Sequence, residues 1–254
     1  MRLCQKHGSW VHGWVVLILL LPVLARADMK VLAQETFEEY DTTAVHNGRA
    51  MVWSSDVKGG IEVVDGFGLV RGKAFRGNKV VGILPFMVLA NPGDTVKVHF
   101  SFRLPGPIAG TPGGFKMGLF EGGDPANPWF ATPGNGYRWN IGTGSNAVPV
   151  TLAKESGGAG QKVLSGQDTT FIDQSKGSFQ VNDTVRHTAT ITLREGKDGL
   201  HLSLAIDGTA IMSSSDPLTV SLAPTGFAIR SDANIFLFDD FTVEGNMNSN
   251  ANLD

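Results

Sequence analysis

The stretch that decides the fold is Thr95–Leu104, which reads TVKVHFSFRL. Apolar residues occupy every second position, and polar residues occupy the positions between them. Successive side chains of a strand point to opposite faces, whereas a helix would scatter these apolar residues around its circumference. The pattern therefore predicts a strand with one buried face and one polar face. The polar face, which carries Lys97, His99 and Arg103, is a candidate binding surface.

Short segments of strand-forming residues recur along the chain, separated by turn sequences such as Asn91-Pro92-Gly93-Asp94. No long stretch follows the helical period. We predict strands at Ala33–Phe37, Ile61–Val64, Phe67–Arg71, Lys79–Phe86, Thr95–Leu104, Phe115–Glu121, Tyr137–Ile141, Val148–Ala153, Val185–Arg194, Leu200–Asp207, Thr209–Met212, Thr225–Arg230 and Ile235–Val243. Many short strands without a low-complexity linker favour one large all-β sandwich.

The first 27 residues have the composition of a secretory signal peptide. Arg2 and Lys6 supply positive charge, and Trp14–Leu24 is an apolar run of about 11 residues. That run is too short to span a bilayer, which takes about 20 residues. Ala25-Arg26-Ala27 matches a cleavage site, so we expect a secreted or periplasmic protein. The expected organisation is a signal peptide at 1–27, a β-sandwich domain at 28–244 and a polar, disordered tail at 245–254.

Cysteine content and charge exclude several classes of function. Cys4, the single cysteine, lies in the predicted signal peptide, so the mature chain has no thiol chemistry and fits an exported bacterial protein. Loss of Arg2, Lys6 and Arg26 leaves 18 basic against 24 acidic residues, a net charge of −6. Such a charge opposes binding to phosphate backbones, and no second membrane-length apolar run follows. We therefore expect neither nucleic acid nor, after signal cleavage, a membrane as partner.

Four segments, taken in order, resemble a known superfamily. They are Phe37-Glu38-Glu39-Tyr40-Asp41, the hairpin strand Leu200–Ile206 that closes on Asp207-Gly208, Phe227–Arg230, and Phe238-Asp239-Asp240-Phe241-Thr242-Val243. In this order they resemble the concanavalin A-like lectin/glucanase superfamily, in the laminin-G-like form of exported bacterial domains, from roughly Glu35 to Glu244. The resemblance implies an antiparallel jelly-roll sandwich of two sheets, in which sugars bind the concave face.

The same resemblance implies a structural calcium ion between the first and last strands. Glu38 and Asp239 stand at the corresponding positions of this chain. Calcium takes six to eight oxygen ligands, and the sequence nominates only these two side chains. Solvated carboxylates or turn caps are an equal alternative.

The sequence leaves enzymatic activity open. Family-16 glucanases carry Glu-x-Asp-x-(x)-Glu on one strand, and Glu62-Val63-Val64-Asp65 does not have that spacing. A polysaccharide lyase or glycoside hydrolase would have to use His99, Arg103 and their neighbours. Alternating polar residues are equally expected on a solvated outer face.

Aromatic residues suggest carbohydrate binding without catalysis. Tyr137 and Trp139 could stack on the apolar faces of sugar rings while Arg138 and Asn140 bond the hydroxyls, and Trp129 could act likewise from a loop. Large aromatic residues also dominate cores, which is the alternative. We predict an exported, non-catalytic protein that binds a polysaccharide or other glycan; a structural or adhesive surface domain is a further alternative. The site hypotheses require Trp139 to share one cleft with the polar face of Thr95–Leu104.

Overall fold

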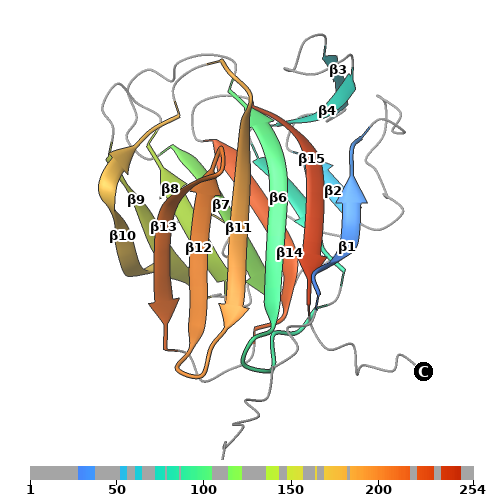
Figure 1. The fold of residues 1–254 in the computed structure, drawn as a ribbon. Helices are drawn as coiled ribbons and strands as arrows, with labels where there is room; N and C mark the ends of the chain where they lie inside the picture. Colours follow the sequence, from blue (N-terminus) through green and yellow to red (C-terminus); the bar gives the residue numbers. More distant parts are fainter. Residues whose placement is uncertain are drawn as a thin grey trace, which may run out of the picture.

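The computed structural model describes two layers of strands joined by turns and loops (Figure 1). It describes residues 28–37, 52–55, 61–64, 72–77, 79–85, 87–104, 114–121, 136–142, 148–156, 164, 169–181, 184–217, 222–231 and 236–246. Within these residues, no helix is long and apolar enough to cross a membrane. The predicted signal peptide, Glu38 and Trp129 lie outside them.

Sheet A faces the viewer in Figure 1 and has eight strands. Its order is β13 (Thr209–Asp216), β12 (Leu200–Ile206), β11 (His187–Glu195), β6 (Thr95–Arg103), β15 (Phe236–Gly245), β4 (Gly72–Gly77) and β3 (Ile61–Val64), with β1 (Lys30–Glu35) paired to β15. All neighbouring strands are antiparallel.

Sheet B lies behind sheet A and has seven strands, which are also antiparallel. Its order is β10 (Thr169–Phe179), β9 (Val148–Glu155), β8 (Gly136–Ile141), β7 (Phe115–Glu121), β14 (Pro224–Ser231), β5 (Lys79–Ile83) and β2 (Val52–Ser55). Successive strands lie in different sheets at β1/β2, β2/β3, β4/β5, β5/β6, β6/β7, β10/β11, β13/β14 and β14/β15. The predicted all-β, two-sheet antiparallel jelly-roll sandwich is confirmed.

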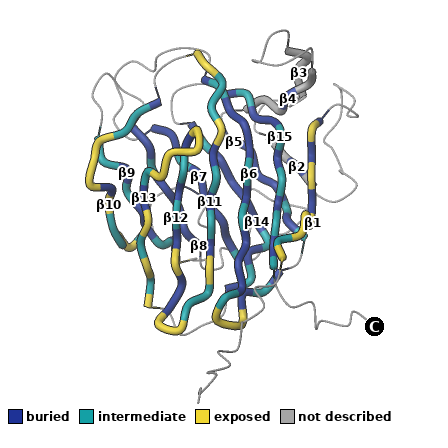
Figure 2. The backbone as a smooth tube through the Cα atoms, viewed as in Figure 1, coloured by how far each residue is buried: buried dark blue, intermediate teal, exposed yellow. Residues whose placement is uncertain are grey.

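The alternation of Thr95–Leu104 appears directly in the burial of β6. Val96, Val98, Phe100 and Phe102 are at most 2% exposed and face sheet B, whereas Lys97, His99 and Arg103 face outward and are half-buried. Figure 2 shows the same change between buried and more exposed positions along the sheet A strands. Burial of one side of each strand fixes which residues the other side offers to a ligand.

Aromatic rings from both sheets form the centre of the core. Trp53 of β2 packs edge-on against Phe241 of β15, with ring centroids 4.9 Å apart, and against Phe238 at 5.2 Å. Phe100 of β6 meets Phe227 of β14 at 5.1 Å. These rings are at most 2% exposed, so they join the two layers by apolar burial and by edge-to-face contacts.

The last strand extends beyond the predicted domain boundary at residue 244. Gly245 ends β15, and the Asn246 side chain accepts a hydrogen bond from the Thr95 backbone N–H at 2.7 Å. The first two residues of the predicted tail, 245 and 246, therefore belong to the sandwich. Residues 247–254 lie outside the described part of the chain.

Removal of one of the central rings should cost much of the stability. We expect Phe227→Ala to lower the free energy of unfolding by about 3–5 kcal/mol, because it leaves a cavity between the sheets. Phe171→Ala is the matched control, since Phe171 is 61% exposed and should change stability by no more than about 0.5 kcal/mol. Chemical denaturation followed by circular dichroism measures both. Equal losses in the two variants would contradict this assignment of the core.

Candidate functional site

The aromatic residues singled out in the sequence lie in the core. Tyr137 and Trp139 project inward from β8 and are 0% exposed. Their side chains belong to the same buried cluster as Val98 and Phe100 of the facing sheet. A sugar ring cannot reach either side chain at these positions, so both are removed from the candidate binding surface.

The Tyr137 hydroxyl instead joins the two sheets. It donates a hydrogen bond to Asp216 Oδ2 of β13 at 2.8 Å, and Lys154 Nζ of β9 lies 3.6 Å from the same oxygen. Burial of the phenol, followed by its hydrogen bond to the Asp216 carboxylate, raises the pKa of Tyr137 far above its usual value. Tyr137 is therefore a neutral, structural donor.

His99 and Arg103 lie on the outer face of sheet A. His99 Nδ1 is 2.9 Å from Thr190 Oγ1, and its Nε2 is 3.4 Å from Glu244 Oε2. The polar face of β6 (Lys97, His99 and Arg103) points away from the core that contains Trp139. These residues and Trp139 therefore do not share one cleft. The shared-cleft hypothesis is therefore corrected.

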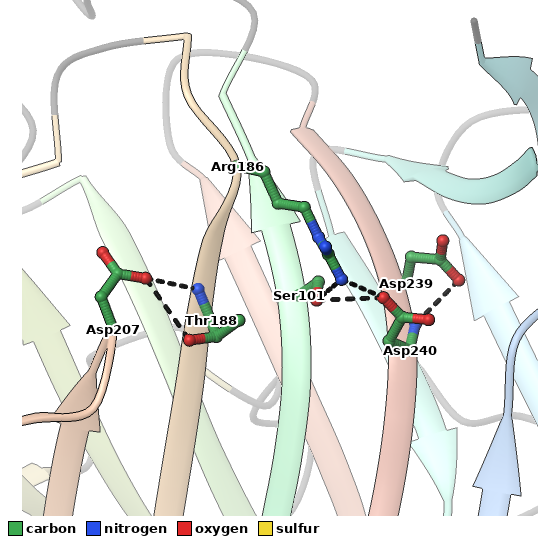
Figure 3. A network of polar contacts seen from close by, with 6 residues as sticks. All are labelled: Ser101, Arg186, Thr188, Asp207, Asp239 and Asp240. Atoms are coloured by element: carbon green, nitrogen blue, oxygen red, sulfur yellow. Dashed lines mark hydrogen bonds and ion pairs between the residues drawn. The ribbon is translucent and has the colours of Figure 1, made fainter. Parts of the chain in front are cut away.

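Acidic groups also accompany the basic ones on this face (Figure 3). Arg186, just before β11, forms an ion pair with Asp240 and donates a hydrogen bond to Ser101 Oγ at 2.7 Å. Ser101 in turn donates to Asp240 Oδ2 at 3.2 Å. The outer face of sheet A is thus a mixed, internally paired surface, and not a uniformly basic one.

The described residues include only one of the two expected calcium ligands, Asp239. Asp239 is 8% exposed, and its Oδ1 accepts the Asp240 backbone N–H at 2.7 Å. Asp240 has a φ of 50°, at an irregularity in the pairing of β15 with β6, and its carboxylate is paired with Arg186. Among the described residues, no group of three or more His, Cys, Asp or Glu side chains could hold a metal ion. Because Glu38 lies outside them, calcium remains a prediction.

Arg138 points to the opposite side of the sandwich, the outer face of sheet B. Its guanidinium forms a buried ion pair with Glu155 of β9 at 3.0 Å, with side chains 9% and 3% exposed. It also donates to Thr169 Oγ1 at 3.4 Å, while Glu155 Oε2 accepts the backbone N–H of Leu164 at 3.1 Å. This pair holds Leu164 against the sheet.

A continuous row of polar side chains crosses the same face. Adjacent strands place six residues in register, one from each of β10, β9, β8, β7, β14 and β5. We call this set the polar row: Gln174, Thr151, Asn140, Lys116, Arg230 and Lys79. With neighbouring strands about 4.8 Å apart, the row extends over about 24 Å. Except for Lys79, its members are half-buried or exposed.

Unsatisfied polar atoms mark the centre of this face. Asn140 Nδ2 donates to Thr151 Oγ1 at 2.8 Å, but the buried Asn140 Oδ1 has no hydrogen-bond partner in the structure. Arg138 Nε is likewise buried without a partner. Buried polar atoms are nearly always hydrogen-bonded, so Asn140 Oδ1 and Arg138 Nε retain unused capacity for a hydrogen bond.

Phe171 adds an apolar surface at the margin. It is opposite Ala153, which is itself opposite Arg138, so its side chain lies on the outer face of sheet B. At 61% exposed, its ring is open to solvent. The sequence pattern does not single out Phe171, because the segment Thr169–Phe179 lacks the alternation of a half-buried strand.

Comparison with known proteins gives likenesses of fold only. No protein-family model and no curated protein matches this chain. The Emp47p carbohydrate recognition domain is 14% identical, with 84% of this chain and 93% of that chain covered and a TM-score of 0.49. The carbohydrate-binding module CBM66 from Bacillus subtilis is 16% identical, with 73% and 95% covered and a TM-score of 0.39. The alginate lyase Aly36B is 10% identical, with 83% and 95% covered and a TM-score of 0.45. Likenesses of this size assign neither a family nor a ligand to this chain.

The shielded phenol of Tyr137 gives a pH prediction. The chain has two tyrosines, so in a Tyr40→Phe variant Tyr137 is the single one left. The folded pKa is raised above the unfolded value of about 10. The contribution of Tyr137 to stability is therefore full below that value and falls as the pH rises beyond it. In an alkaline titration followed by ultraviolet absorbance, we expect tyrosinate to form only as the chain unfolds. Ionisation near pH 10 in the folded protein would contradict it.

The buried ion pair gives a stability prediction. We expect Glu155→Gln to lower the free energy of unfolding by about 3–5 kcal/mol, because it leaves the Arg138 charge buried and uncompensated. The double variant Arg138→Met with Glu155→Leu should recover most of this loss, since neither charge remains. Chemical denaturation of the wild type and both variants checks the pair. A double variant less stable than Glu155→Gln would contradict the expectation.

Proposed function

We propose that this protein binds carbohydrate, without catalysis, on the outer face of sheet B. The observation that carries the proposal is the polar row, with the unsatisfied Asn140 Oδ1 at its centre. Sugars present many hydroxyl groups, and each can both donate and accept hydrogen bonds. Asn140, Thr151 and Gln174 supply complementary donors and acceptors on adjacent strands.

The dimensions of the face support an extended ligand. An uninterrupted row of about 24 Å can contact several sugar units in succession, with each unit meeting side chains from a different strand. The exposed ring of Phe171 supplies an apolar surface on which the C–H face of a sugar can pack. The combination of an aromatic ring with polar groups is suited to a hydroxylated ring that is apolar on its faces.

The described residues of the same face offer no free pair of carboxyl groups for hydrolysis. Glycoside hydrolysis uses a pair of carboxyl groups, one as acid and one as nucleophile or base. Glu155, a carboxylate on this face, is bound to Arg138 and to the Leu164 N–H. It is therefore held as a structural anion, and we infer that binding does not lead to bond cleavage.

The expected location of the protein outside the cytoplasm supports the same proposal. We infer that residues 1–27 direct export, which would bring the binding face to the extracellular or periplasmic space where polysaccharides occur. Carbohydrate-binding domains among the proteins of similar fold are compatible with this function, but the argument rests on the polar row.

A glycan array tests the proposal. We expect the wild-type protein to retain at least one glycan, and Asn140→Ala to weaken binding about tenfold or more. A loss of one to two hydrogen bonds corresponds to that factor. His99→Ala, on the outer face of sheet A, is the control and should bind like the wild type. Circular dichroism should show both variants folded.

Two results would overturn the proposal. The first is a folded wild-type protein that retains no glycan. The second is loss of binding in His99→Ala with full binding in Asn140→Ala, which would move the site to sheet A.

A further inference from the structure

Three of the six residues in the polar row are cations on adjacent strands. Lys116 of β7 lies opposite Arg230 of β14, and Arg230 lies opposite Lys79 of β5. Neighbouring strands are about 4.8 Å apart, so three positive charges originate within about 10 Å along one line. Like charges placed directly opposite each other on a sheet are destabilising. An anion bound along this line would be attracted by all three charges.

This cluster is positively charged, whereas the whole chain has a net negative charge. The sequence has 24 acidic and 21 basic residues, a net charge of −3. The polar row nevertheless contains three cations and no carboxylate. Each cation also has contacts within the chain, among them the hydrogen bond from Arg230 to the Leu164 carbonyl at 3.2 Å. The attraction for an anion therefore follows from the close spacing of these charges and does not require them to be free of contacts within the chain.

Partial burial strengthens the effect of this cluster. Lys79 is 9% exposed, and Lys116 and Arg230 are half-buried. Charges that are partly removed from water are screened less and act more strongly on a nearby anion. Arginine can also bind a carboxylate or sulfate through two parallel hydrogen bonds.

We infer that the polar row selects an acidic glycan, whose carboxylate or sulfate groups lie over Lys116, Arg230 and Lys79. This inference rests on the proposed function and names its ligand class. The neutral half of the row, from Gln174 to Asn140, would then contact the sugar hydroxyls. The cationic half would hold the charged groups of the next units.

Matched polymers test the inference with the full-length mature protein. Polygalacturonate is compared with its methyl ester for carboxylate, and dextran sulfate with dextran for sulfate, by isothermal titration calorimetry at low and high salt. We expect at least one acidic polymer to bind ten times more tightly than its neutral partner. That preference should shrink as salt is added, because salt screens the charges. The polymer pair that shows the preference identifies the anionic group.

A matched pair of arginine variants locates the effect. Arg230→Gln should weaken binding of the acidic polymer at least tenfold and leave the neutral polymer unchanged. Arg194→Gln is the control, because Arg194 is exposed on the outer face of sheet A, and it should bind like the wild type. If Arg230→Gln fails to fold, Lys116→Gln takes its place.

The outcomes separate this inference from the proposed function. Equal binding of acidic and neutral polymers, or an equal loss in Arg194→Gln, overturns the inference and leaves carbohydrate binding in place. If the array retains only neutral glycans, the inference is likewise overturned and carbohydrate binding stays in place. If the protein binds no glycan on the array and no polymer in the calorimeter, both proposals are overturned.

Discussion

Packing of inward-facing side chains between the two sheets is the constraint on which the rest of the structure depends. Rings from β2, β6, β14 and β15 interlock at centroid distances near 5 Å. Because strand side chains alternate, each residue fixed in this core also fixes the outward direction of its neighbours. A slip of one residue in β7 would turn Met117 outward and bury Lys116 in the core. The outward row is therefore a direct consequence of the inward packing.

Strands were predictable from the sequence where one face is apolar and the other polar. β6 and β12 show strict alternation, and the structure places both close to their predicted bounds. β10 was not predicted because it is an edge strand whose pairing with β9 shifts register twice. Ser175 is its one buried residue, so no apolar stripe marks it. β2 was also missed, since four residues with two serines give too short a pattern.

The candidate site was only partly predictable. Parity within β8 separates Tyr137 and Trp139 from Arg138. The sequence nevertheless suggested all three as sugar ligands, because parity alone does not tell which face of the strand is buried. The polar row could not be found in this way. Lys79, Lys116 and Arg230 come from three distant parts of the chain, and only the observed strand order and register make them neighbours. Local alternation gives the direction of a side chain but not its cross-strand partner.

Residues of the chain itself cover part of the outer face of sheet B beside the polar row. Phe120 lies over Gly136, where an added Cβ would stand 2.0 Å from the ring, so only glycine permits this position. Leu164 packs with Phe120 and is held by the Glu155 carboxylate through its N–H and by Arg230 through its carbonyl. Arg230 thus borders both the covered part and the polar row. Because the apolar cluster lies on one side of the row, the proposed extended ligand, if it contacts Arg230, would run across the strands along the row. That direction brings it successively over one side chain from each strand.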